Sequence, residues 1–287
     1  MIRPYILLLP AFIAIISIIA YPTIKALTMS FQSYSLLKPN DIKFIGLGNY
    51  FRAFKDEIFW YSLGRTFTYI AGTVGFQFIF GFILALFLNS TSAFSRLSRN
   101  LMLIPWVVPG VLAAFMFRWM FNANYGLVNA ILVKLKLIDN NIAWLTDLNY
   151  AMPTVIIASV WKGLSFFGLM IFAGLQAVPK ELYEAARIDG ANRVQQLFRI
   201  TIPSIMPIII TTTLLRIIWT ANSVDLIFNM TEGGPGFNTQ ILSVYTFMIA
   251  RSTMDYGYAA SLSILLTVFM FIVILFYVKQ ARKQELL

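Results

Sequence analysis

A set of polar side chains interrupts a strongly apolar stretch, residues 205–228, and its spacing places it on one face of a helix. That face carries Thr212, Arg216, Trp219, Thr220 and Ser223, with Asn222, Asp225 and Asn229 in a neighbouring row. An indole plane beside hydroxyl and amide groups can stack on a sugar ring and hydrogen-bond its hydroxyls. A charge at the bilayer centre costs ~2.5–3.5 kcal/mol on insertion scales, so Arg216 favours a face turned to a water-filled path. The alternative is a face that only holds helices together, at ~0.6 kcal/mol per hydrogen bond.

A second candidate set lies in the preceding apolar stretch, residues 151–175. On a helix, Trp161, Ser165 and Gly168 share one face there, and Lys162 and Phe166 share the adjoining one. Two further basic residues in apolar stretches, Lys25 and Arg118, lie near the expected helix ends, where long side chains reach the interface.

Residue types that support catalysis or metal binding are scarce. The chain of 287 residues holds no cysteine and no histidine, which removes thiolate chemistry, disulfides and the commonest metal ligand and general base. No pair of carboxylates lies within an apolar stretch, so acid–base catalysis there lacks its groups. We therefore expect no catalytic residue, no metal site and no cofactor bound by this chain.

The composition is that of a membrane protein. Hydrophobic residues make up 59% and charged residues 12%, about half of the ~25% usual in soluble domains. A span needs about 20 apolar residues. We predict a single all-α integral membrane domain over residues 1–287, with spans near residues 5–29, 66–88, 101–121, 151–175, 205–228 and 258–278. The net charge of +10 is scattered through loops, which favours roles at the membrane surface over nucleic-acid binding.

Three of these spans have marked local features. A cleavable signal peptide is the alternative for the first, but Ala20-Tyr21-Pro22 is a poor cleavage site, so we expect the span to be retained. The third contains Pro105 and Pro109 and should be kinked and buried in the bundle, where neighbours satisfy the freed carbonyls. Gln77 in the second should hydrogen-bond a neighbouring helix.

Between the fourth and fifth spans lies a long polar segment, residues 179–203. A helix that ends at Gly190 should be followed by a second short helix closed by Pro203. An amphipathic segment of this kind can rest on lipid headgroups or dock on a protein. Ala185 and Ala186 favour docking, because small residues allow close approach.

The spacing within this segment resembles the EAA loop of ABC importer permeases. The match runs Glu184-Ala185-Ala186, two residues, Asp189-Gly190, nine residues, Ile200, one residue and Ile202-Pro203, with Ile202 where the family usually has Leu. The resemblance implies a six-transmembrane-helix type I ABC importer permease core with a cytoplasmic helix-turn-helix coupling loop. It also implies that the loop sits in a cleft of an ATPase subunit. The coupling residues would be Glu184, Ala185, Ala186, Asp189, Gly190, Ile200 and Pro203.

Two shorter stretches resemble the carbohydrate-uptake branch of these permeases. Gly46-Leu47-Gly48-Asn49-Tyr50 is similar to a Gly-Leu-x-Asn-Tyr stretch found after the first span. Gly233-Gly234-Pro235 is similar to the Gly-Gly-Pro element of the maltose-type first permease, with an ordinary tight turn as the alternative. In the family, the fourth and fifth spans line the transport cavity. By position, this favours a pathway of Trp161, Gly163, Ser165, Phe166, Arg216, Trp219, Thr220, Asn222 and Ser223.

The implied function is that of a permease subunit that forms half of a sugar pathway by alternating access. The implied location is a bacterial or archaeal plasma membrane, with both termini cytoplasmic. The implied partners are a cytoplasmic ATPase dimer, a second homologous permease, an extracellular or periplasmic solute-binding protein, the sugar and the lipid bilayer. The chain has no Gly-x-x-x-x-Gly-Lys-Ser/Thr loop, so ATP and Mg²⁺ should bind to the ATPase partner and this chain should not be an enzyme.

Two other transport functions are open alternatives. A permease for another small polar solute, such as glycerol phosphate, fits the same residues. A secondary transporter would need midplane carboxylates and internal repeats, and the one acidic residue in a predicted span is Asp225, near its outer end. Basic residues are only slightly more frequent in the segments expected inside, so the orientation depends mainly on the coupling loop.

Overall fold

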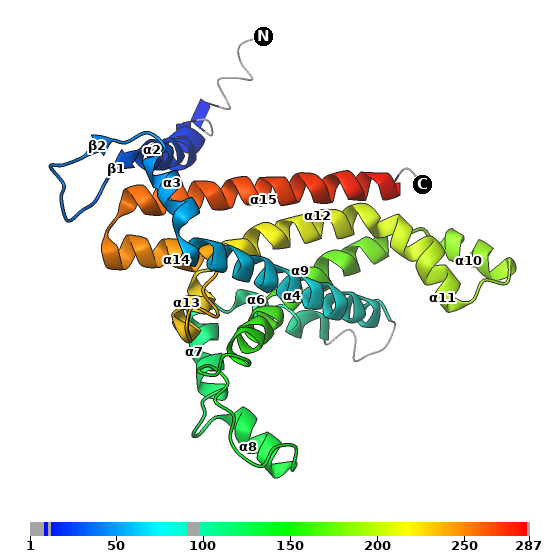
Figure 1. Ribbon diagram of the computed structural model, residues 1–287. Helices are drawn as coiled ribbons and strands as arrows, with labels where there is room; N and C mark the ends of the chain where they lie inside the picture. Colours follow the sequence, from blue (N-terminus) through cyan, green and yellow to red (C-terminus); the bar gives the residue numbers. More distant parts are fainter. Residues whose placement is uncertain (1–8, 11–12, 91–97, 286–287) are drawn as a thin grey trace, which may run out of the picture. The chain divides into compact units, whose positions relative to one another are not determined.

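The structure, a computed structural model, describes residues 9–10, 13–90 and 98–285 and is built almost entirely of helices (Figure 1). Within these residues, five helices are long and apolar enough to cross a membrane, and a bent pair makes a sixth crossing if it is one span. The prediction of an all-α membrane protein is confirmed.

The bounds of the elements follow the chain order. They are η1 (Ile16–Ala20), α2 (Tyr21–Ser30), β1 (Gln32–Ser33), β2 (Lys43–Phe44), α3 (Gly48–Lys55), α4 (Glu57–Leu88), α6 (Ile104–Val107), α7 (Gly110–Met120), α8 (Leu127–Lys134), α9 (Ala151–Ala177), α10 (Lys180–Ile188), α11 (Arg193–Gln196), η2 (Leu197–Thr201), α12 (Ile202–Ala221), α13 (Asp225–Thr231), α14 (Leu242–Met248), η3 (Ile249–Thr253) and α15 (Tyr256–Glu285). The η elements are π-helical turns. The chain divides into two compact units. The first comprises residues 1–63 and 245–269, and the second comprises residues 64–244 and 270–287.

In the first unit, the Gly-Leu-x-Asn-Tyr stretch joins α3 to the end of α2. The side-chain amide of Asn49 is buried and donates to the carbonyl oxygens of Ser30 at 3.0 Å and Gln32 at 2.9 Å. The hydroxyl of Tyr50 lies 2.7 Å from Ser30 Oγ. β1 pairs with β2 in antiparallel fashion just beyond this point. The motif residues therefore have a structural use in this unit.

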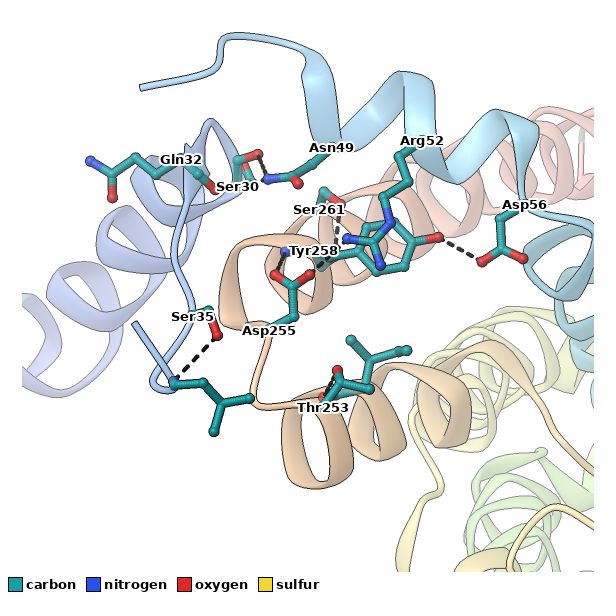
Figure 2. A network of polar contacts seen from close by, with 12 residues as sticks. Ser30, Gln32, Ser35, Asn49, Arg52, Asp56, Thr253, Asp255, Tyr258 and Ser261 are labelled. Atoms are coloured by element: carbon teal, nitrogen blue, oxygen red, sulfur yellow. Dashed lines mark hydrogen bonds and ion pairs between the residues drawn. The ribbon is translucent and has the colours of Figure 1, made fainter. Parts of the chain in front are cut away.

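A polar network fixes the start of α4 in the same unit (Figure 2). Arg52 donates to Asp255 Oδ2 at 2.7 Å, and its guanidinium lies 3.9 Å from the ring centroid of Tyr258. The hydroxyls of Tyr258 and Tyr245 donate to Asp56 Oδ2 at 2.7 Å and 2.5 Å. Burial alone would raise the pKa of Asp56, but these two bonds and backbone N–H groups hold it below its usual value.

In the second unit, α9 is the central helix. It contacts α6, α7, α12 and α13. Phe167 and Ile171 of α9 and Ile205 of α12 are fully buried. In lipid, such helices associate through close packing and hydrogen bonds, because lipid tails are as apolar as the side chains. Figure 1 shows α10 and α11 beyond the ends of α9 and α12.

The third predicted span is broken more sharply than expected. The helix ending at Val107 and the helix α7 make an angle of 97°. Val108 and Pro109 between them are extended, as a proline and its preceding residue prefer. The predicted kink is confirmed, but burial of the whole span is wrong. Only one face of α7 is buried, and Leu112 on its other face is 59% exposed.

The fifth predicted span differs at its start. The chain is helical from Arg193 to Ala221, because α11, η2 and α12 follow one another without a break. The prediction that Pro203 closes a helix is therefore wrong. The π-helical turn η2 leads into α12, and Pro203 is the second residue of α12.

The fifth span also ends earlier than residue 228. Asn222 caps α12, and its side-chain amide donates to the carbonyl of Ile218 at 2.9 Å. α13 is a separate short helix that contacts α7 and α9. Ser223 therefore does not continue the helical stripe of Arg216, and Asp225 does not continue the neighbouring row on the same helix.

The helices of the second and sixth predicted spans are longer than predicted. α4 begins at Glu57 where the prediction began at 66, and α15 covers Tyr256–Glu285 where the prediction was 258–278. Part of the first predicted span, residues 5–8 and 11–12, lies outside the described residues.

Candidate functional site

A polar cavity of about 340 Å³ opens among the helices of the second unit. Residues from α4, α6, α9, α12 and α13 and from the link between α12 and α13 line it. They are Tyr69, Thr73, Trp106, Ser159, Lys162, Arg216, Trp219, Thr220, Asn222, Ser223, Asp225 and Leu226. All but Leu226 carry a hydroxyl, amide, indole or charged group. The cavity is thus a polar site among apolar helices.

Several residues of the predicted substrate pathway line this cavity: Arg216, Trp219, Thr220, Asn222 and Ser223. Arg216 and Thr220 are one turn apart on α12 and share a face. Asn222 and Ser223 reach the cavity by another route, because the chain leaves the helix after Ala221.

Three other predicted residues, Trp161, Ser165 and Phe166, are not among the lining residues. Trp161 packs edge-on against Phe117, with ring centroids 5.4 Å apart. Ser165 is buried. The ring of Phe166 lies 5.0 Å from that of Trp219, at 60°. Phe166 therefore packs edge-on against the indole of Trp219.

Gly163 provides the space in which Arg216 and Gln77 meet. A Cβ atom at this position would lie 2.1 Å from Gln77 Nε2 and 2.4 Å from an Arg216 Nη atom. Arg216 Nε donates to Gln77 Oε1 at 2.8 Å, and Gln77 Nε2 donates to the carbonyl of Ser159 at 2.6 Å. The prediction that Gln77 bonds a neighbouring helix is confirmed. Gln77 links α4, α9 and α12 and fixes one edge of the guanidinium.

Two threonine hydroxyls at the cavity have no hydrogen-bond partner among the described residues. The side chains of Thr73 and Thr220 are 0% and 3% exposed, and neither Oγ1 atom has a hydrogen bond within the described part of the chain. A buried hydroxyl left unpaired costs ~1–3 kcal/mol. A bound molecule with hydroxyls of its own would supply the missing partners.

The acidic residue of the cavity is engaged with the protein. Asp225 Oδ2 lies 3.9 Å from Lys162 Nζ. The same oxygen lies beside Gly110, the first residue of α7, where a Cβ atom would approach it to 1.7 Å. A carboxylate at a helix N-terminus is stabilised by the free N–H groups and the helix dipole. Asp225 therefore balances Lys162 and the start of α7.

The sequence analysis missed Tyr69, Thr73, Trp106, Ser159 and Leu226. Tyr69 OH and Ser159 Oγ lie 2.5 Å apart, which connects α4 to α9 next to the cavity. The available signal was the spacing of Tyr69, Thr73 and Gln77 at intervals of four on α4, which places them on one face. Ser159 lies one turn before Gly163 on α9.

A second candidate site is the turn between α10 and α11. Gly190 has a φ of +79°, and Asp189 caps α10 before it. The N–H of Ala191 bonds the carbonyl of Ala186 at 2.8 Å, and that of Gly190 bonds Arg187 at 3.1 Å. This pair of bonds is a Schellman motif, which needs a left-handed residue at the position of Gly190.

The turn presents both small and large apolar side chains. Of the predicted coupling residues, Ala186 and Ile200 are half-buried, and the exposed ones are Glu184, Ala185, Asp189, Gly190 and Pro203. Large apolar side chains are exposed beside them at Leu182, Ile188, Val194 and Phe198. An unpartnered apolar surface of this kind marks an interaction site. No group of three or more Asp and Glu residues that could hold a metal occurs in the described ranges.

The comparisons with known proteins agree on one family. The family described as "Binding-protein-dependent transport system inner membrane component" matches residues 77–285. The sulfoquinovosyl glycerol transport system permease protein SmoG of Agrobacterium fabrum is 35% identical over 98% of this chain and 90% of its own length. The trehalose/maltose transport system permease protein MalF of Thermococcus litoralis is 34% identical over 97% of this chain and 93% of its own length.

Solved structures show the same fold. A chain of a bacterial ABC transporter involved in the import of the acidic polysaccharide alginate matches with a TM-score of 0.84. The match covers 98% of this chain and 95% of the other, at 23% sequence identity. The predicted fold of an ABC importer permease is thereby confirmed.

Proposed function

Because this chain belongs to the family of binding-protein-dependent transport system inner membrane components, we propose that it is the permease subunit of an ABC importer that takes up a sugar. The likeness to sugar-transport permeases over almost the whole chain carries this proposal. The finer assignments below rest on the geometry of the two candidate sites.

The cavity around Arg216 is the proposed solute pathway of this subunit. Trp219 offers an indole face on which a sugar ring can stack, and Phe166 packs edge-on against that indole. Thr73 and Thr220, whose hydroxyls are unpaired among the described residues, are among the residues that line this cavity. A second, homologous permease would supply the other half of the pathway, and transport proceeds by alternating access.

The α10–α11 turn is the proposed contact with the ATPase. Exposed Ala185 permits close approach, while Ile188 and Phe198 supply apolar area around it. ATP and Mg²⁺ bind to the two ATPase partners, and this chain transmits their closure to α9 and α12, which flank the turn. A solute-binding protein delivers the sugar at the opposite side of the membrane. In this arrangement the turn and both termini are cytoplasmic, and the complex lies in a bacterial or archaeal plasma membrane.

Co-purification from native membranes tests the proposal first. A tagged chain should bring down an ATP-hydrolysing subunit, a second permease and a solute-binding protein. The reconstituted complex should then show ATP-driven uptake of a sugar. Trp219→Ala should lower that uptake, whereas Trp119→Ala, at a 57% exposed tryptophan of α7, should leave it unchanged. A chain that purifies without any ATPase would contradict the proposal.

A further inference from the structure

The charges that line the cavity do not balance. Lys162 and Arg216 are basic and Asp225 is acidic, which leaves one positive charge over. Asp225 is paired with Lys162 and lies at the start of α7. Within the described residues no carboxylate lies within 4 Å of Arg216. The surplus charge therefore belongs to Arg216.

The protein contacts of Arg216 hold the guanidinium without neutralising it. Its Nε donates to Gln77 Oε1, which is uncharged. The ring centroid of Trp219 is 6.0 Å away, at the far limit of a cation–π contact. The neutral amide aligns one edge of the guanidinium, and no hydrogen bond from the remaining N–H groups is found in the described part of the chain. A planar group with free N–H donors is suited to an oxyanion bound through two parallel hydrogen bonds.

Arg216 is half-buried in a cavity among apolar helices, and an anionic partner there would offset the cost of removing its charge from water. The cavity already provides an indole face and unpaired threonine hydroxyls for a sugar ring. An oxyanion on that sugar would complete the site by pairing with Arg216. Lysine in the same place would lack the planar fork, and a neutral sugar would leave the charge uncompensated.

We propose that the solute of this importer is an acidic sugar, one that carries a carboxylate or sulfonate, and that its oxyanion pairs with Arg216. This inference rests on the proposed sugar-uptake function and narrows its substrate class. Arg216 is then a specificity-determining residue.

Uptake by the complete importer in proteoliposomes, supplied with its binding protein and ATP, tests the inference. The probes are matched pairs of labelled sugars: D-glucuronate against D-glucose, and 6-deoxy-6-sulfoglucose against D-glucose. The variants are Arg216→Gln, Arg216→Lys and, as a control, Arg118→Gln, which removes a charge from α7 outside this cavity. Co-purification of the partner subunits confirms assembly of each variant.

The wild type should take up an acidic sugar in preference to its neutral partner. Arg216→Gln should lower acidic uptake on the order of 30-fold, the low end of what truncating one partner of a buried charge pair costs. Uptake of the acidic sugar by Arg216→Lys should lie between that of the wild type and that of Arg216→Gln. Arg118→Gln should keep the wild-type preference for acidic sugars. Equal uptake of neutral and acidic sugars, unchanged in Arg216→Gln, would overturn the inference and leave the sugar-uptake function standing. ATP-dependent uptake of no sugar of either kind would count against the proposed function itself.

Discussion

Replacing Gly163 by alanine should disturb the cavity through a single methyl group. The added Cβ would lie 2.1 Å from Gln77 Nε2 and 2.4 Å from Arg216, far inside van der Waals contact. Both atoms are the ends of flexible side chains, so Gln77 and Arg216 should swing aside. Their movement breaks the 2.8 Å bond between them and the 2.6 Å bond from Gln77 to Ser159.

The expected cost follows from these two bonds. In soluble proteins a bond to a charged group contributes ~1.5–3 kcal/mol and a neutral one ~0.5–1.5 kcal/mol. Interhelical bonds in membranes average only ~0.6 kcal/mol. We therefore expect a loss of about 1–2 kcal/mol, a factor of roughly 5–30 in the folded-to-unfolded ratio. Uptake should fall further, because Arg216 leaves its place in the cavity.

Thermal unfolding of the purified complex and uptake per assembled complex measure both effects. Gly75→Ala is the matched control, since Gly75 is also a helical glycine and a Cβ there meets nothing within 4 Å. The reasoning would be refuted if Gly163→Ala had the same melting temperature and the same uptake as Gly75→Ala.

Three further predictions concern other parts of the chain. Gly190 has a φ of +79°, so Gly190→Val should lower the amount of solute transported per ATP hydrolysed. Gly190→Asn should retain coupling, because Asn tolerates the left-handed region. Equal coupling in the two variants would contradict the role of the turn. Thr220→Val keeps the side-chain shape and removes an unpaired hydroxyl, so the melting temperature should hold or rise while uptake falls; unchanged uptake would show that the hydroxyl is not used. The pKa of Asp56 is lowered in the folded state, so its carboxylate stabilises the fold above the usual carboxyl range, and this stability is lost as pH falls through the folded-state pKa. The difference in melting temperature between wild type and Asp56→Asn should therefore shrink below pH ~4. A difference that stays constant with pH would contradict this.

Local patterns in the sequence were enough to predict some features of the two candidate sites. The spacing of Arg216 and Thr220 indicated a shared face, and both line the cavity. Gly190 was expected to end a helix, and it does so in a Schellman motif. These features depend on neighbours within one or two turns, which a single sequence contains.

Other features depended on contacts between distant segments. Ser223 was placed on the stripe of Arg216, although the helix ends at Ala221 and the chain turns back to the cavity. Trp161 shares a face with Ser165 but packs on Phe117 of α7. A periodic pattern indicates which residues share a face, and only the packed helices decide what that face meets.

Pro203 shows the limit of a local rule. A proline inside a helical pattern usually ends or kinks the helix. Here a π-helical turn precedes it, so the helix continues from the α10–α11 turn into the membrane span. A continuous helix is better suited than a hinged one to carry a displacement from the turn to Arg216.

Alternating access of the cavity around Arg216 is the central claim, and the absence of cysteine from this chain makes it directly measurable. Ser223→Cys places one thiol at the cavity, on a half-buried lining residue, and mass spectrometry of this chain reports its modification by a membrane-impermeant thiol reagent. In proteoliposomes, the reagent should reach this cysteine from the cytoplasmic side without nucleotide. With trapped ATP and the binding protein present, the reagent should reach the cysteine from the opposite side. Labelling from one and the same side in both states would contradict the account.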